Sequence, residues 1–234
     1  MAPASPDDDD LSGDLELSIL GVAARERDDG ALGVVINTSR GELTGVVHAR
    51  DGDDGAAIYA GGALGGLDGP ANAIYPRLAS DLAATEGGIS GLRLHYRMPG
   101  EFEECVLDVL AGVSFLKGLG ARRVALVGHS FGAAVVIKAG ELSGVVTGVA
   151  ALSSQLYGTR TVQRLSPKAL LLVHGDDDTV LDSAASRDIY DRALEPKRLV
   201  IYEDAGHGLT QCADELFALL RAWLLDVAGT AKTS

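Results

Sequence analysis

Three features are scarce in this 234-residue chain: cysteine, long apolar runs and positive charge. Its two cysteines, Cys105 and Cys212, are far apart and lie in expected helices, so they indicate neither a disulfide framework nor a metal-ligand spacing. No apolar run approaches the roughly eighteen residues that a membrane-spanning helix needs. Lysine and arginine number 20 against 33 acidic residues, a net charge of −13. Nucleic acids and anionic membranes repel such a chain, so neither is an expected partner.

The ends of the chain are expected to be tails that flank one domain. Residues 1–13 are acidic and lack the basic and apolar regions of a secretory signal, which predicts a disordered tail and a cytoplasmic location. Residues 230–234 are a second short tail. The chain is 47% hydrophobic, and no repeat or long linker divides it. We therefore expect residues 14–229 to form one domain, as a monomer or a homodimer.

Two successive patterns predict an α/β fold. Up to about residue 62, short apolar or alternating runs are separated by turn sequences such as RDDG, which predicts three or four strands beginning at residues 15–20. From residue 70 onward, helical segments alternate with buried strands, and such crossovers require parallel pairing. We expect a mostly parallel sheet of about eight strands, with an antiparallel start and helices on both faces.

The stretch VALVGHSFGAAVVI, residues 124–137, places a serine between an expected strand and an expected helix. Gly128 and Gly132 flank Ser130 in the pattern G-x-S-x-G, which suits a turn too tight for larger residues. Such a turn presents the Ser130 hydroxyl at the carboxyl edge of the sheet. In a parallel sheet this edge is where distant segments converge and where function gathers.

Two further strand ends carry reactive side chains. Asp176, Asp177 and Asp178 follow the run LLLVHG, and His207 follows LVIYEDAG. A serine hydroxyl is a weak nucleophile, so a neutral imidazole must accept its proton, and a carboxylate must orient that imidazole. The order serine, acid, histidine on three strand ends therefore predicts nucleophilic catalysis at one edge of the sheet.

These motifs resemble the α/β-hydrolase superfamily over about residues 30–228. The matching segments are GHSFG as a nucleophile elbow, HGDDDTVLD and EDAGHGL. The resemblance implies Ser130 as the nucleophile, His207 as the general base and then acid, and Asp178 as the carboxylate that orients His207. It also implies an oxyanion hole, with one donor from the backbone N–H of Phe131.

The second oxyanion donor is expected in the turn YAGGALGG, residues 59–66, and we predict Gly62. This turn has Ala60 and Gly61 where relatives commonly have histidine and glycine. It lacks the patterns of a P-loop and of a dinucleotide-binding turn. His129 and His174 are interpreted as structural histidines, and no zinc-binding pattern is present, so neither a metal nor an organic cofactor is expected.

The segment QLYGTRTVQRLSPK is short where many relatives insert a cap. The resemblance is therefore to lidless proteins of the dienelactone-hydrolase-like and small carboxylesterase kind, which implies an open site and no cap domain. We expect a serine hydrolase that cleaves esters of small or medium acyl substrates through an acyl-enzyme on Ser130; no substrate-binding residue is predicted. A thioesterase or acyltransferase with the same residues is the alternative, and a non-catalytic binding protein of this fold is a third.

Overall fold

The computed structural model describes residues 16–52 and 54–229, so the predicted tails, residues 1–13 and 230–234, lie outside the described residues. The strands are β1 (Ile19–Glu26), β2 (Leu32–Thr38), β3 (Gly41–His48), β4 (Gly55–Ala60), β5 (Ser90–His95), β6 (Arg123–His129), β7 (Val146–Leu152), β8 (Ala169–Gly175) and β9 (Lys197–Tyr202). The helices are α1 (Pro70–Ala84), α2 (Phe102–Gly118), α3 (Phe131–Leu142), α4 (Ala184–Arg192) and α5 (Ala213–Ala228), with a 3-10 turn η1 (Val162–Leu165).

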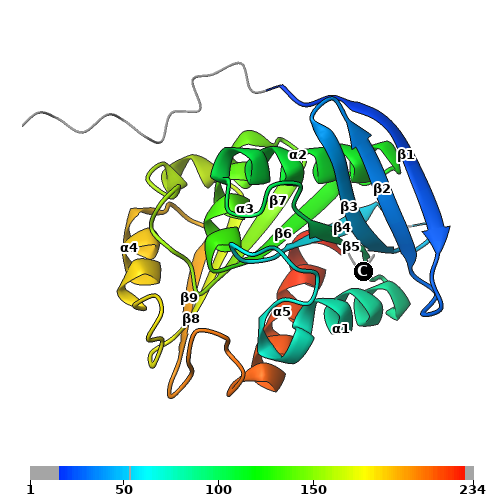
Figure 1. The fold of residues 1–234 in the computed structure, drawn as a ribbon. Helices are drawn as coiled ribbons and strands as arrows, with labels where there is room; N and C mark the ends of the chain where they lie inside the picture. Colours follow the sequence, from blue (N-terminus) through cyan, green and yellow to red (C-terminus); the bar gives the residue numbers. More distant parts are fainter. Residues whose placement is uncertain (1–15, 53, 230–234) are drawn as a thin grey trace, which may run out of the picture.

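All the described strands join one sheet in the order β1-β2-β3-β5-β4-β6-β7-β8-β9 (Figure 1). The pairs β1–β2, β2–β3 and β3–β5 are antiparallel, and the other pairs are parallel. The predicted α/β architecture, with its antiparallel start and helices on both faces, is confirmed. The number of strands is nine rather than about eight, because the whole antiparallel start pairs with the parallel part.

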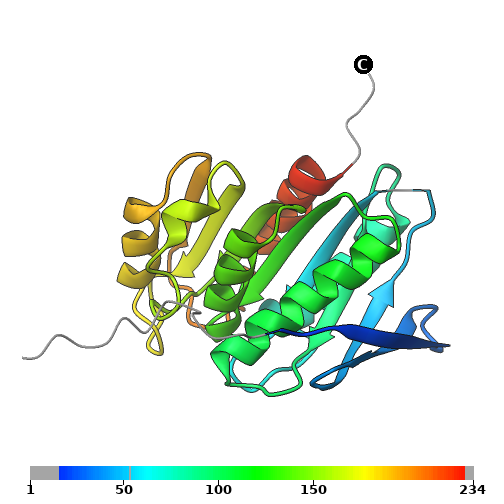
Figure 2. The ribbon, with the colours of Figure 1, turned by 90° about the horizontal axis from the view of Figure 1, so that it is seen from above.

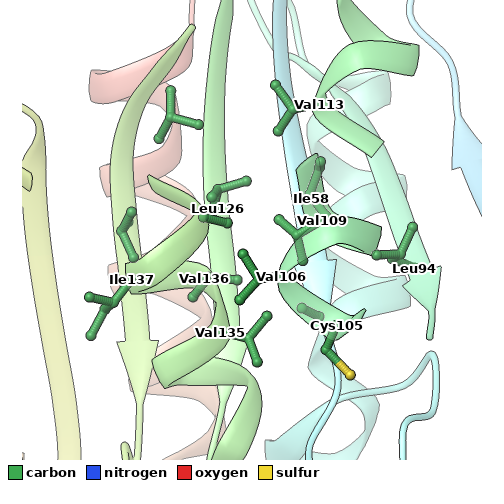
Figure 3. Packing of buried hydrophobic residues seen from close by; sticks show 14 of the residues in the cluster. Ile58, Leu94, Cys105, Val106, Val109, Val113, Leu126, Val135, Val136 and Ile137 are labelled. Carbon is green, nitrogen blue, oxygen red and sulfur yellow. The ribbon is translucent and has the colours of Figure 1, made fainter. Parts of the chain in front are cut away.

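Helices cover both faces of this sheet and enclose two hydrophobic clusters. Residues of α2, α3 and α4 pack on one face, and residues of α1 and α5 pack on the other (Figures 1 and 2). Successive residues of a strand point to opposite faces, so Ile58 joins the first cluster and Tyr59 the second. Figure 3 shows Ile58 and Leu126 of the sheet beneath α2 and α3. Each such buried side chain contributes roughly 1.5–3 kcal/mol by leaving water.

The first strand begins later in the chain than the sequence indicates. We predict it at residues 15–20, of which residue 15 lies outside the described part, whereas β1 is Ile19–Glu26. The reason is the RDDG sequence, which forms a hairpin turn in which the Arg27 N–H donates to the Ala31 carbonyl at 2.9 Å. The pairing of β1 with β2 continues up to this turn, where Glu26 lies opposite Leu32. An edge strand exposes much of its length, so its polar end needs no burial.

The connection between β7 and β8, residues 153–168, contains only the four-residue turn η1. It therefore adds no cap over the carboxyl edge of the sheet. Every helix in the described part of the chain is too short or too polar to cross a bilayer.

Candidate active site

Ser130 lies at the turn from β6 into α3, in a backbone conformation that is rare for a residue with a side chain. Its φ is 59° and its ψ is −120°. A Cβ atom added at Gly128 would clash with the Gly132 carbonyl, and one added at Gly132 would clash with the Gly61 carbonyl. Both glycines are therefore required by close backbone approach. The turn leaves the Ser130 side chain partly exposed at the carboxyl edge of the sheet.

Ser130 is connected to two side chains from other loops: His207 contacts Ser130, and Asp178 contacts His207. The Ser130 Oγ is 3.0 Å from Nε2 of His207, which follows β9. The His207 Nδ1 is 2.8 Å from Oδ2 of Asp178, which follows β8. A carboxylate can only accept, so Nδ1 carries the proton and the Nε2 of a neutral ring is free to accept from the serine hydroxyl. This arrangement can remove the proton of Ser130 during nucleophilic attack.

The structure separates Asp178 from the two aspartates before it. Its side chain is 0% exposed, whereas Asp176 and Asp177 are exposed. The Asp178 Oδ1 accepts the N–H groups of Val180 at 2.8 Å and Leu181 at 2.9 Å. Burial raises the pKa of Asp178, but the hydrogen bonds from the Leu181 N–H, from His207 and from the Val180 N–H outweigh burial and lower it. Asp178 is thus a buried carboxylate that remains ionised.

The loops that carry the acid and the histidine meet through their backbones. A Cβ atom added at Gly175, the last residue of β8, would clash with the carbonyl of Ala205. The N–H of Asp177 donates to the same carbonyl at 3.1 Å. Only a glycine permits this approach, which brings the loop of Asp178 within reach of His207.

The main chain of His207 is held by two further side chains. The His129 Nε2 is 2.9 Å from the His207 carbonyl oxygen, and the Ser153 Oγ donates to that oxygen at 3.1 Å. The rings of His129 and His207 lie 4.8 Å apart. Burial lowers the pKa of His129 to about 4, so its ring is neutral near pH 7 and donates from Nε2. His129, interpreted from sequence as structural, therefore contacts the site directly.

We expect His129 to make folding sensitive to acid. Its pKa is about 4 in the folded chain against about 6.5 when unfolded, so between these values the unfolded chain binds more protons and stability falls as the pH falls. Acidification from pH 7 to 5 should cost about 2 kcal/mol through this residue. Urea unfolding of the wild type and of His129→Gln at both pH values measures this contribution. Glutamine retains an N–H donor without titrating, and equal pH dependence in the two proteins would contradict the assignment.

The residues predicted to supply oxyanion donors border Ser130. Phe131 is the first residue of α3, and the N–H groups of a first helical turn have no partner within the helix. A Cβ atom added at Gly62 would lie 3.9 Å from the Ser130 Cβ and 3.9 Å from the His129 carbonyl oxygen. The Gly65 N–H donates to the Gly62 carbonyl at 2.9 Å, which closes a tight turn beside the serine. The two residues thus lie on the same side of the fold as the hydroxyl.

Exposed apolar side chains surround this edge, and we call them the apolar rim. They occur on the loops after β4, β5, β7 and β8, on both sides of the β6 strand that carries Ser130. The rim consists of Leu64, Met98, Leu156, Tyr157 and Val180. Leu64 is 94% exposed. These residues were not predicted from the sequence. The signal that could have found them is the presence of large apolar residues in loops that are otherwise rich in glycine and polar residues.

A series of aromatic rings connects the rim to the nucleophile turn. The Tyr157 and Phe102 rings are 5.1 Å apart, the Phe102 and Phe131 rings 5.9 Å, and the Phe131 and Tyr96 rings 6.5 Å, all edge to face. Gly158 has a φ of +81°, and a Cβ atom there would clash with the Phe102 ring. The residue directly after Ser130 is therefore continuous with an apolar surface that reaches solvent at Tyr157.

Metal-ligating side chains are not clustered within residues 16–52 and 54–229. No three histidine, cysteine, aspartate or glutamate side chains are grouped there so as to hold a metal ion. Cys105 and Cys212 are both buried with free thiols.

Comparison with known proteins places this fold and this site in one context. Residues 106–219 match the model of a family described as phospholipase/carboxylesterase. The matched segment runs from α2 into α5 and includes Ser130, Asp178 and His207. No curated protein matches the sequence significantly.

Solved structures similar to this chain are α/β-hydrolases. A dienelactone hydrolase from Anabaena variabilis superimposes with a TM-score of 0.73 at 16% identity, covering 88% of this chain and 99% of its own. XC6422 from Xanthomonas campestris, a serine hydrolase without a lid, superimposes with a TM-score of 0.67 at 17% identity. The match covers 88% of this chain and 99% of XC6422. Est1E from Butyrivibrio proteoclasticus superimposes with a TM-score of 0.66 at 16% identity, and the match covers 88% of this chain and 98% of Est1E. The chain has the α/β-hydrolase fold.

Proposed function

We propose that this protein is a serine hydrolase of carboxylic esters. The observation that carries the proposal is the continuous contact from the Ser130 hydroxyl through His207 to the buried Asp178, at a turn that exposes the serine. The match of residues 106–219 to a phospholipase/carboxylesterase family supports the same chemistry. Ser130 serves as the nucleophile, His207 as the general base and acid, and Asp178 as the carboxylate that fixes the ring of His207.

The reaction follows from the atoms that face one another. His207 Nε2 takes the hydroxyl proton as Ser130 Oγ attacks the ester carbonyl carbon, and the N–H groups of Phe131 and Gly62 stabilise the charge on the carbonyl oxygen. The new imidazolium then gives its proton to the departing alcohol, which leaves an acyl group on Ser130. Water, deprotonated by the same nitrogen, then attacks the acyl carbon. The bond from this carbon to Ser130 Oγ breaks as the imidazolium returns its proton to Oγ, which releases the carboxylic acid and regenerates the serine.

We infer that the acyl part of the substrate is small or medium in size and apolar, and that it lies on the apolar rim. Leu64, Leu156 and Tyr157 flank the strand of Ser130, and the aromatic series extends this surface from the nucleophile turn. Apolar contact stabilises a bound acyl chain by about 0.8 kcal/mol per buried methylene.

The decisive experiment combines labelling with turnover. A fluorophosphonate should attach one label to each protein molecule, which intact-mass measurement detects. Turnover of p-nitrophenyl esters should be faster than turnover of acyl-CoA thioesters with the same acyl group. Faster thioester turnover would assign the site to the thioesterase alternative. Absence of both labelling and turnover would overturn the enzymatic proposal in favour of a binding protein.

Hydrolysis should decline on the acid side of neutrality. His207 must be neutral to accept the serine proton, and histidine changes its charge between about pH 5 and 8. The value of kcat/KM for a p-nitrophenyl ester, measured across this range with circular dichroism as a check on folding, should therefore fall as the pH falls. A flat profile in a folded protein would exclude a histidine base.

The rim predicts a dependence on acyl length that a matched pair of leucines can test. Replacing Leu64 by serine should lower kcat/KM for an octanoyl ester about tenfold, through the loss of one to two methylene contacts, and leave acetyl ester turnover nearly unchanged. Leu142→Ser is the control, because Leu142 is also exposed but lies at the C-terminal end of α3, away from the site. Equal losses for both esters, or for both variants, would contradict binding at the rim.

A further inference from the structure

A second histidine contacts the carboxylate that we propose as the orienting acid. His174 is the penultimate residue of strand β8 and is completely buried. Its Nε2 is 3.1 Å from Oδ2 of Asp178 and 2.9 Å from the carbonyl oxygen of Leu181. Its Nδ1 is 2.7 Å from Oγ of Ser186, a buried residue of α4. Every ring nitrogen of His174 thus has a partner.

The chemistry of these partners fixes the position of the ring proton. Both partners of the His174 Nε2 are oxygens that can only accept, so Nε2 carries the proton and shares it between them. In the neutral ring Nδ1 is then an acceptor, and the Ser186 hydroxyl donates to it. The tautomer is thus set by the acceptors at Nε2, and the Ser186 hydroxyl anchors the other side of the ring.

Four N–H donors consequently converge on Asp178. The backbone N–H groups of Val180 and Leu181 bond Oδ1, and the imidazoles of His207 and His174 bond Oδ2. Donors on both oxygens fix the plane of the carboxylate. The donor from His174 also withdraws charge from the oxygen that His207 contacts, because both share Oδ2.

We propose that His174 is a positioning residue of the hydrolase: it orients Asp178 and moderates the charge that Asp178 presents to His207, and Ser186 holds the His174 ring in the orientation that this requires. The proposal rests on the proposed function. It changes the interpretation of His174 from a histidine satisfied within the core to one that acts on the nucleophile through Asp178 and His207.

The surroundings of Asp178 make the direction of the effect definite. His207 from the loop after β9 and His174 from β8 bond Asp178 directly, and His129 from β6 is close enough for an electrostatic interaction with it. From α4, the neutral hydroxyl of Ser186 bonds His174. Asp176 and Asp177 of its own loop are exposed. Removing the donor of His174 leaves more negative charge on Oδ2, which favours the protonated form of His207. The acid limb of the kcat/KM profile should therefore move to higher pH.

Two pairs of variants test this. His174→Gln retains an N–H donor near the position of Nε2, whereas His174→Leu removes it. Ser186→Ala removes the hydroxyl that anchors the His174 ring. Ser143→Ala is its control, because Ser143 is also buried, at the end of α3, and its hydroxyl accepts from the nearby Val145 N–H. We expect His174→Leu and Ser186→Ala to lose about tenfold in kcat/KM and to shift the acid limb upward by about half a pH unit or more. His174→Gln should recover most of both effects.

Nuclear magnetic resonance of the 15N-labelled protein supplies a readout that does not require turnover. The imidazole of His174 should show its proton on Nε2, and the Nδ1 proton of His207 should change its chemical shift in Ser186→Ala but not in Ser143→Ala. A His174 proton on Nδ1, or a loss of activity and stability without a shift of the acid limb, would overturn the proposal and leave His174 a structural residue. If the wild type hydrolyses no ester, the proposed function fails, and the resonances still decide whether His174 is coupled to His207.

Discussion

Replacing Ser130 by alanine is expected to lower kcat by about 10⁴-fold or more, since a nucleophile that works as part of a unit loses nearly the whole benefit of that unit. The hydroxyl bonds the Nε2 of His207, and its loss leaves the imidazole without a group to activate. The turn itself should persist, because its conformation depends on Gly128 and Gly132 rather than on the hydroxyl. Steady-state kinetics and thermal unfolding of the purified variant measure the two expectations separately.

The control for this variant is Ser154→Ala. Ser154 is a buried serine at the end of the neighbouring strand β7, and its hydroxyl bonds the Gln155 carbonyl rather than the imidazole. Activity within a few-fold of the wild type is expected there, together with full fluorophosphonate labelling. Labelling of Ser130→Ala, or activity near that of the wild type, would identify a different nucleophile.

Replacing Asp178 by asparagine should reduce kcat at least about a hundredfold, whereas the same change at Asp176 or Asp177 should cost less than about tenfold. The carboxylate accepts N–H groups on both oxygens, but an amide has one oxygen and one NH₂ group. If the amide oxygen faces Val180 and Leu181, the NH₂ group faces His207 and forces the ring proton onto Nε2. That nitrogen can then no longer accept a proton from Ser130.

The three aspartate variants form an internal comparison. Asp176 accepts the N–H of Asp204 at 2.8 Å on the outside of the loop, so its replacement changes a surface contact only. Kinetics for each variant, with circular dichroism to verify folding, give the ranking. A hundredfold loss of kcat in Asp176→Asn or Asp177→Asn, with a nearly normal kcat in Asp178→Asn, would mean that the wrong carboxylate has been assigned.

The order of the elements could be predicted from sequence because local patterns determine it. The helix after Ser130 occupies residues 131–142, as the pattern predicts, and the strand ALLLVHG is β8. The first strand was misplaced because an edge strand needs little apolar character. The first turn of α1 could not be predicted either: Ala71, Asn72 and Ala73 have positive φ values, a conformation that alanine rarely adopts.

The contacts of His129 and His174 show why part of the site could not be predicted from sequence. Each of these histidines lies at the end of a strand whose apolar residues are explained by the hydrophobic core. Their hydrogen-bond partners come from other segments: Ser186 of α4 for His174, and the carbonyl of His207 for His129. Which partners they meet depends on how closely these segments approach. Such distances depend on backbone contacts at Gly175 and Gly132 that a pattern of residue types does not contain.

Backbone segments approach one another closely at Gly61, Gly132 and Gly175, whereas the side chains of the apolar rim lie at the surface of the same edge. The reactive groups are positioned mainly by main-chain contacts, in which neighbouring carbonyls occupy the space of absent side chains. The side chains of the rim, by contrast, are exposed, although the main chain of Val180 bonds Asp178 and the Tyr157 ring packs against Phe102. Exchanges at Leu64, Met98 and Leu156 can therefore accumulate with little effect on the spacing of Ser130, His207 and Asp178. On the proposed function, directed evolution of specificity should therefore begin at these rim positions and leave the glycines unchanged.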